Sequence, residues 1–308
     1  IVGSGIDILV HAEMLHSAIE NTKAESVEIT PEPNRIKLKV GSRVASVPTL
    51  PVADNWTERQ ERRALTRIQV SNHDAFVPIL KIAHGIAKLS KFDDRKHVEI
   101  TPENGHVRVA CSNGYQTLWA KCDCITKGSG TTAVPVEAID EMLKAASSSM
   151  LIRVFDNAIA YNSGSLSLES SIRADSKLVT PMIPRVMESH RKLDSPSAIV
   201  DRIELINAIK SADSVSQKRA IPSVKVEIDI AKLVVSCDNS ETSVTSDVPA
   251  YTIGTTSFRF AASDIVGTLS KLSSEKVWIE HHPDSPAAWF SPHGDENILI
   301  AVQIIRNE

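Results

Sequence analysis

Cysteine and histidine are the residues of this sequence that most readily bind metals, and they occur in two small groups. Cys122 and Cys124 flank Asp123, and Cys111 precedes them. Residues two positions apart on a strand point to the same side. A structural zinc site takes four ligands, however, and the sequence has no second close pair to complete one. The spacing therefore does not predict a zinc site.

The remaining chemical motifs are incomplete. His281-His282-Pro283-Asp284 reads as a hairpin loop, where neighbouring side chains face opposite ways and chelate poorly. The Gly-Ser-Gly triplets at 3–5 and 128–130 lack the Gly-Lys-Ser/Thr that follows in a phosphate-binding loop. The sequence also lacks the Gly-x-Ser-x-Gly turn of serine hydrolases. We therefore expect no catalytic activity, no cofactor and no metal.

Length and composition describe an ordinary globular chain. Of its 308 residues, 42% are hydrophobic and 23% are charged, and this length suggests two or three domains. No apolar run approaches the roughly 20 residues that span a bilayer. The four irregularly spaced cysteines fit a reducing cytosol, so we expect a cytoplasmic protein. A net charge of −4 excludes a uniformly basic surface for nucleic acid but leaves room for a local basic face.

A unit of roughly 55–65 residues recurs along the chain. Each unit has a short extended segment, an amphipathic helix and two or three alternating strands, and polar caps are expected at Ser71-Asn72 and Ser263-Asp264. Apolar residues at three- and four-residue spacing predict five helices. These residues are Met14, Leu15 and Ile19; Phe76, Ile79, Leu80, Ala83, Ile86 and Ala87; Ile139, Met142 and Leu143; Ile203, Ile206 and Ile209; and Ile265, Leu269 and Leu272.

Alternation with a period of two predicts the strands that follow each helix. They are 27–30 and 36–40; 98–101 and 107–112; 151–155, 159–162 and 166–171; 224–228 and 233–237; and 277–282 and 298–305. Asn104-Gly105 predicts a tight hairpin turn.

The units run approximately over 5–56, 65–126, 130–186, 197–254 and 256–308. Two units back to back, with sheets outside and helices together, make a two-layer α+β domain. Pairing predicts a second domain over 66–186 and a third over 196–308, joined by the polar segment 187–197. The first unit, over 1–58, has no mate, so we expect it to be the second half of a domain whose first half is absent here.

Three short motifs stand at the predicted domain ends. They are Ser42-Arg43 followed by Thr49-Leu50-Pro51-Val52-Ala53-Asp54, then SKLVTPMIP from Ser176 to Pro184, and AVQIIR at 301–306. In this order and spacing they resemble the bacterial sliding clamp family, the β subunit of DNA polymerase III. The resemblance implies the DNA clamp fold, with tandem βαβββ-type repeats, sheets outside and helices lining a central hole. It also implies that two subunits join head to tail in a ring around duplex DNA.

Such a ring attracts phosphates with basic side chains and makes no base contacts. Aromatic residues, at 4%, are too few for a platform that stacks single-stranded bases. Each lysine alone is equally a solubilising surface residue, and the first helix offers Glu13 and Glu20 against only Lys23. The positions that the resemblance implies as DNA-facing are Lys81, Lys88, Lys91, Arg95, Lys96, Lys144, Lys210, Lys218 and Lys271.

The resemblance further implies a groove between the second and third domains for short peptides of the DNA polymerase and the clamp loader. A groove of this kind buries one or two apolar side chains of the peptide. Val302 and Ile304 are equally explained as core residues of the last strand, and Gly114 as a turn glycine. The matching positions are Ser112, Gly114, Tyr115, Gln116, Thr117, Pro184, Ile221, Val302, Gln303, Ile304, Ile305 and Arg306.

The resulting hypothesis is a non-catalytic processivity factor. It would act as a homodimeric ring that slides on duplex DNA and tethers DNA polymerase and other replication or repair proteins. The alternative is a non-catalytic repeat scaffold that binds a protein or ligand without encircling DNA. The negative net charge and the modestly basic helices favour that alternative.

Overall fold

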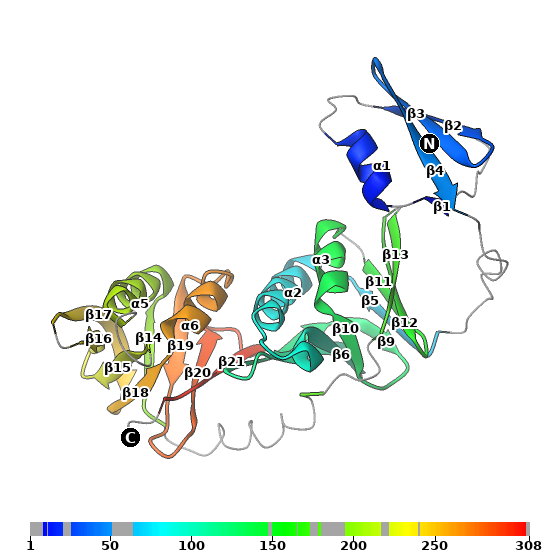
Figure 1. The fold of residues 1–308 in the computed structure, drawn as a ribbon. Helices are drawn as coiled ribbons and strands as arrows, with labels where there is room; N and C mark the ends of the chain where they lie inside the picture. Colours follow the sequence, from blue (N-terminus) through cyan, green and yellow to red (C-terminus); the bar gives the residue numbers. More distant parts are fainter. Residues whose placement is uncertain are drawn as a thin grey trace. The chain divides into compact units, whose positions relative to one another are not determined.

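The computed structural model describes residues 9–10, 12–20, 26–50, 64–146, 150–164, 166–172, 178–179, 195–216, 222–239 and 241–305. The chain divides into two compact units, Ile1–Arg62 and Arg63–Glu308, which are described separately (Figure 1). Among the described residues, no helix has the length and apolar character needed to cross a membrane.

The first unit holds one helix and one four-stranded sheet. Its elements are β1 (Leu9–Val10), α1 (Ala12–Ile19), β2 (Val27–Glu32), β3 (Arg35–Val40) and β4 (Arg43–Leu50), and the sheet order is β1-β4-β3-β2. Alternating residues of β3 are buried, because Ile36 and Leu38 pack with Val47 of β4. Leu15 and Ile19 of α1 complete this small core, as their spacing predicts.

The second unit repeats the same order of elements four times. The repeats are β5 (Thr66–Val70), α2 (His73–Lys88), β6 (His97–Glu103), β7 (His106–Ser112) and β8 (Gln116–Asp123); β10 (Thr132–Pro135), α3 (Val136–Lys144), β11 (Met150–Val154), β12 (Ala158–Ser163) and β13 (Leu166–Ser171); β14 (Ser197–Asp201), α5 (Arg202–Ser216), β15 (Val224–Asp229), β16 (Lys232–Asp238) and β17 (Ser243–Ile253); and β18 (Thr256–Phe260), α6 (Ala262–Leu269), β19 (Lys276–Glu280), β20 (Ala287–Pro292) and β21 (Ile298–Gln303). A short η1 (Asp93–Arg95) and β9 (Ile125–Lys127) are additions to the first of these. With the first unit, the strand–helix–three-strand pattern occurs five times, which confirms the predicted α+β repeat.

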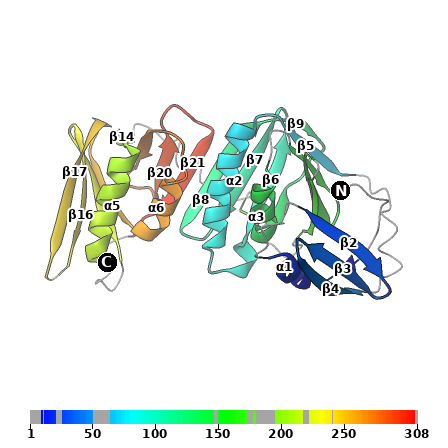
Figure 2. The same ribbon diagram turned by 90° about the horizontal axis from the view of Figure 1, so that it is seen from above.

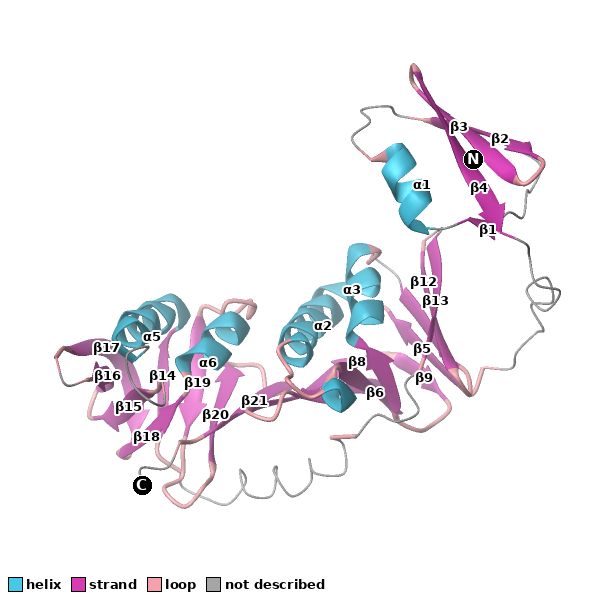
Figure 3. Cartoon of the chain, viewed as in Figure 1, coloured by secondary structure: helices cyan, strands magenta, loops and turns pink. Residues whose placement is uncertain are grey.

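Two sheets carry these strands, and the helices lie on one side of them (Figures 2 and 3). Twelve strands follow the order β10-β6-β7-β8-β21-β20-β19-β14-β17-β16-β15-β18, and five follow β13-β12-β11-β5-β9. The strands β8 and β21 pair antiparallel from Ala120↔Ile298 to Gln116↔Val302. A continuous sheet therefore joins residues on both sides of the predicted boundary between the second and third domains.

Of the two helix caps predicted from the sequence, one is correct and one is wrong. Asn72 caps α2, because its side-chain oxygen accepts from the Ala75 N–H at 3.2 Å. The expected cap at Ser263-Asp264 is wrong, since α6 already begins at Ala262 and its N-cap Ala261 makes no side-chain bond. A cap that the sequence reading missed is Asp201, whose carboxylate accepts from Ile203 N at 2.8 Å and Glu204 N at 2.9 Å.

Candidate functional site

The pairing of β8 with β21 brings together the two groups of residues predicted to form the partner groove. Gln116 lies opposite Val302, and Thr117 lies opposite Ala301. One residue further along, the Gln303 N–H donates to the Tyr115 carbonyl at 2.8 Å. Segments far apart in the sequence thus meet at one end of this strand pair.

The turn from Ser112 to Thr117 is fixed by its own side chains. The Asn113 carboxamide oxygen accepts from Tyr115 N at 2.9 Å and from Gln116 N at 2.7 Å, which closes the turn. Ser112 donates to the Gln116 carbonyl at 2.9 Å. Gly114 has a φ of +96°, where a side chain would be strained. This geometry leaves Tyr115 47% exposed at the tip of the turn.

Two of the predicted groove residues lie inside the protein and do not face a partner. Gln116 is 1% exposed and accepts a hydrogen bond from the Thr268 hydroxyl of α6 at 3.0 Å. Val302 is also 1% exposed and belongs to the main core. Both residues therefore contribute to the packing of α6, β8 and β21. Pro184, Ile221 and Arg306 lie outside the described residues.

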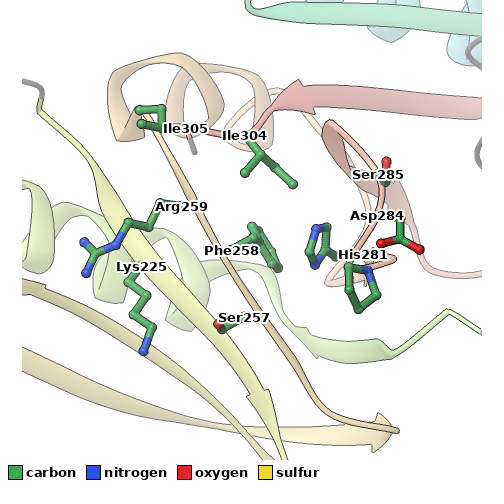
Figure 4. A pocket seen from close by; sticks show the side chains of 10 residues that line it. Lys225, Ser257, Phe258, Arg259, His281, Asp284, Ser285, Ile304 and Ile305 are labelled. Carbon is green, nitrogen blue, oxygen red and sulfur yellow. The ribbon is translucent and has the colours of Figure 1, made fainter. Parts of the chain in front are cut away.

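The C-terminal residues Ile304 and Ile305 line a cavity of about 520 Å³ within the predicted third domain (Figure 4). No residue of 112–117 lines it. The other walls come from β15, β18 and the loop between β19 and β20, and they are Lys225, Ser257, Phe258, Arg259, His281, Pro283, Asp284 and Ser285. The sequence reading missed these residues. The alternation of Phe258, Arg259 and Phe260 was the available signal, because it places a cation on the face opposite two buried aromatic rings.

His281 is buried beside this cavity in the neutral form. Its ring lies 4.8 Å from the Phe258 ring, and its Nδ1 lies 2.8 Å from the Thr256 hydroxyl. Burial, and to a smaller extent the neighbouring His282, lowers the pKa of His281 to about 4. The cavity wall therefore carries no positive charge from His281 near neutral pH.

Three of the predicted DNA-facing residues lie on α2 or shortly after α6. Lys81 and Lys88 are exposed on α2. Lys271 reaches across to α2, where a Cβ added to Gly85 would lie 1.7 Å from its Nζ. Burial, followed by repulsion from Lys88, lowers the pKa of Lys271. Burial likewise lowers the pKa of His84, although Asp140 at 3.7 Å opposes this effect.

Other basic residues in the predicted set have partners. Lys144 lies 2.9 Å from Asp140 and 2.8 Å from Glu141, and the hydrogen bonds to Glu141 and Asp140 raise its pKa. Lys96 pairs with Asp93 at 2.8 Å, and Arg95 lies over the Phe92 ring at 5.0 Å. Lys91 and Lys210 are exposed, whereas Lys218 lies outside the described residues. The structure therefore divides the predicted set into exposed cations and cations that are already compensated.

The cysteines are buried thiols. Cys111, Cys122, Cys124 and Cys237 are all buried and free, and Cys111 donates to the Ala83 carbonyl at 3.4 Å. Burial raises the pKa of Cys122 to about 11 and that of Cys124 to about 12. In the described part of the chain, no three His, Cys, Asp or Glu side chains are grouped as metal ligands.

Comparison of the sequence with protein-family models and with curated proteins finds no match. Comparison of the fold with solved structures finds many. The DNA polymerase III β subunit of Thermotoga maritima has a TM-score of 0.82 at 16% identity, over 99% of this chain and 83% of that one. The β chain of Streptococcus pneumoniae has a TM-score of 0.80 at 15% identity, over 100% of this chain and 82% of that one. This chain has the sliding-clamp fold.

The sliding-clamp fold confirms the resemblance of the sequence motifs at the level of architecture. A third clamp structure, from Pseudomonas aeruginosa and bound to griselimycin, has a TM-score of 0.76 at 16% identity, over 91% of this chain and 76% of that one. At identities of 15–16%, the likeness to these structures shows the fold alone.

Proposed function

We propose that this chain is a sliding clamp, a non-catalytic processivity factor that encircles duplex DNA and tethers DNA polymerase. The observation that carries the proposal is the agreement of nearly the whole chain with clamp structures, at a TM-score of 0.82 over 99% of its length. The fivefold strand–helix–three-strand repeat supports it independently, because it comes from this chain alone.

In this proposal the helix side faces the DNA. Lys81, Lys88 and Lys91 are exposed, and Lys271 adds a fourth cation near Gly85 of α2. Mobile, exposed ammonium groups attract phosphates without reading bases, and this lets a ring hold duplex DNA and still slide. Lys144 and Lys96 contribute less, because nearby carboxylates already compensate their charges.

Within the described residues, β4 and β17 each have a partly unpaired edge, and these edges support head-to-tail closure by a second copy. In β4, residues Arg43–Pro48 pair with β3, while β1 covers only Thr49 and Leu50 on the other edge. In β17, residues Ser243–Pro249 pair with β16, while β14 covers only Ala250–Ile253. A strand edge with open backbone groups readily adds another strand. We propose that β4 of one subunit pairs with β17 of the other.

Partner peptides dock, in this proposal, where β8 begins and β21 ends. Tyr115 is exposed at the turn, and Gly114 permits that turn. Ile304 and Ile305 are half-buried and directly follow Gln303, whose N–H donates to the Tyr115 carbonyl. Truncation of Tyr115 or Ile305 to alanine should weaken binding of a polymerase-derived peptide without unfolding the chain. Unchanged affinity by titration would remove this groove from the proposal.

Linear DNA with biotin at both ends tests encirclement without a clamp loader. A ring that threads over open ends becomes trapped when streptavidin is added afterwards, and it is excluded when streptavidin is added first. Retention in the first order alone is expected. Equal retention in both orders would contradict encirclement, and sedimentation of the intact chain at the monomer mass would contradict closure by two copies.

The compensated lysines and the net charge of −4 are the observations that favour the alternative, a repeat scaffold that does not encircle DNA. The same experiment separates the two functions. A scaffold would bind its partner peptide and would leave DNA in both orders of streptavidin addition.

A further inference from the structure

The strand β18 is the last in the twelve-stranded sheet, and among the described residues a strand occupies only one of its edges. Lys225 of β15 lies opposite Arg259, and Glu227 lies opposite Ser257. The other edge faces the C-terminal residues and the loop between β19 and β20 (Figure 4). Ile304 and Ile305 of the proposed partner groove line the cavity there, whereas Tyr115 does not.

One backbone hydrogen bond shows that this edge can accept another extended chain. The Ile305 N–H donates to the Arg259 carbonyl at 2.8 Å. Hydrogen-bonding directions alternate along an antiparallel strand, so the backbone groups of Ser257 point the same way as that carbonyl. Among the residues that the structure describes, Ile305 makes the only backbone bond to this edge. Within the described part of the chain, Ser257 therefore offers an open position next to the one that Ile305 uses.

The space beside this edge is large enough for a chain. The cavity of about 520 Å³ runs from Ile304 and Ile305 past Phe258 to Ser257. A second cavity of about 480 Å³ shares Ser257 and continues along Thr256 and Thr255. Its other walls are Glu227, Ile228 and Asp229 of β15 and Val234 of β16, so it lies over the paired side of β18. The cavity of about 520 Å³ is therefore the one beside the other edge.

The charges around the cavity of about 520 Å³ indicate what kind of chain fits beside β18. Arg259 Nη1 is buried without a hydrogen-bond partner within the described residues, and Nη2 lies 3.8 Å from exposed Asp238, beyond hydrogen-bond range. Lys225 is already paired with Glu227 at 2.6 Å, and His281 is neutral. The unmet demand is therefore for an acceptor at Arg259, and a carboxylate forms the strongest bond there.

The alternation of side chains along a strand then sets the sequence pattern. A residue added opposite the Arg259 row shares its face with Arg259, whereas its neighbours share the face of Phe258 and Ile304. Figure 4 shows Arg259 and Lys225 on one side of β18 and Phe258, His281 and Ile304 on the other. Acidic residues are favoured on the first face and apolar residues on the second.

We propose that the free edge of β18 binds an extended segment of a partner protein in which acidic and apolar residues alternate, and that this segment adds a strand to the sheet. The inference deepens the tethering role in the proposed function and rests on it only for the partner being a replication protein. Binding itself depends on β18, Arg259 and the cavity of about 520 Å³.

A fluorescein-labelled peptide, Gly-Leu-Glu-Leu-Glu-Leu-Gly, tests the proposal by fluorescence polarisation with the full chain. A matched peptide carries lysine in place of glutamate. The acidic peptide should bind at least tenfold more tightly than the lysine peptide. Arg259→Glu should reverse this preference, and Arg67→Glu, an exposed arginine on β5, should leave it unchanged. Equal binding of both peptides, or no reversal, would overturn the proposal.

Backbone methylation of the peptide tests strand addition on the unmodified chain, so it is independent of how any variant folds. In a strand, alternate amides face the partner edge. N-methylation of one alternate set should abolish binding, and methylation of the other set should preserve it. Equal effects from both sets would rule out an added strand. DNA trapping is measured separately, so peptide binding without trapping would refute the clamp and keep this inference, and trapping without peptide binding would do the reverse.

Discussion

Replacement of Gly85 by alanine is expected to stabilise the protein, although the added Cβ overlaps the present position of the Lys271 side chain. Gly85 lies inside α2, and its φ is not in the left-handed region, so alanine adopts the same backbone. Alanine in a helix interior is more favourable than glycine by about 0.5–1 kcal/mol. The new Cβ would lie 1.7 Å from Nζ and 3.1 Å from Cε of Lys271, so that ammonium must move.

Moving Lys271 should cost little. Its ammonium is the far end of a flexible side chain, and burial already lowers its pKa, so the charged form is disfavoured where it lies. We therefore expect a net gain of about 0.5–1 kcal/mol, or an increase of roughly 1–4 °C in the midpoint of thermal unfolding. The pKa of Lys271 should rise in the same variant, because the ammonium enters water.

Urea unfolding of matched variants provides the assay. Gly267→Ala in α6 is the control, because a Cβ there meets no atom within 4 Å. In a Lys271→Ala background, Gly85→Ala should gain as much as Gly267→Ala. A loss of more than about 1 kcal/mol from Gly85→Ala, not relieved by Lys271→Ala, would refute the reasoning and indicate that α2 and α6 approach too closely for any side chain.

Three further perturbations test other parts of the molecule. The pKa of His281 is about 4 in the folded protein and 6.5 when the side chain is exposed. Between these pH values the unfolded chain binds more protons than the folded chain. The free energy of unfolding should therefore fall as the pH decreases from 6.5 to about 4. His281→Asn should remove on the order of 1–3 kcal/mol of this pH dependence in urea unfolding, and an unchanged pH profile would count against it. Lys88→Ala should lower the slope of log affinity for DNA against log salt by about 0.9, whereas Lys144→Ala, paired with Asp140 and Glu141, should change it less; equal slopes would contradict this division. Glu99→Ala should cost about 1–3 kcal/mol, because the Val179 N–H loses its buried acceptor. Glu28→Ala should stay within about 0.5 kcal/mol, and similar losses in both variants would show that burial of Glu99 is unimportant.

The repeat was predictable because each unit carries its own local signals. Period-two alternation located β3, β7, β15 and β16, and apolar spacing located the α-helices of the described residues, which are α1, α2, α3, α5 and α6. The strands β8 and β17 were not identified. Trp119 makes the outer face of β8 apolar as well, since it packs beside Trp289 and Leu299 on that face. In β17, valines are separated by polar residues and interrupted by Pro249.

The candidate sites were less predictable, because side chains far apart in the sequence decide them. Motif matching placed Val302 and Gln116 in the partner groove, but the pairing of β8 with β21 and the bond from Thr268 bury both. The alternation of Phe258, Arg259 and Phe260 predicts which face Arg259 occupies, but it does not reveal whether the guanidinium has a partner. Its unpartnered Nη1 becomes visible only when β15, β18 and the C-terminal residues are placed together.

One repeated hexapeptide shows where local sequence stops deciding the structure. Val-Glu-Ile-Thr-Pro-Glu occurs at 27–32 and at 98–103, and it forms a strand followed by a hairpin turn both times. The side chain of Glu28 is 69% exposed and lies near Lys39, whereas Glu99 is fully buried and accepts from the backbone of Val179. The strand β2 is the last in its sheet, while β6 lies between β10 and β7 and packs beneath residue 179. Identical residues thus form the same strand in both places. A contact from a residue 80 positions away decides whether the glutamate is exposed or is a buried hydrogen-bond acceptor.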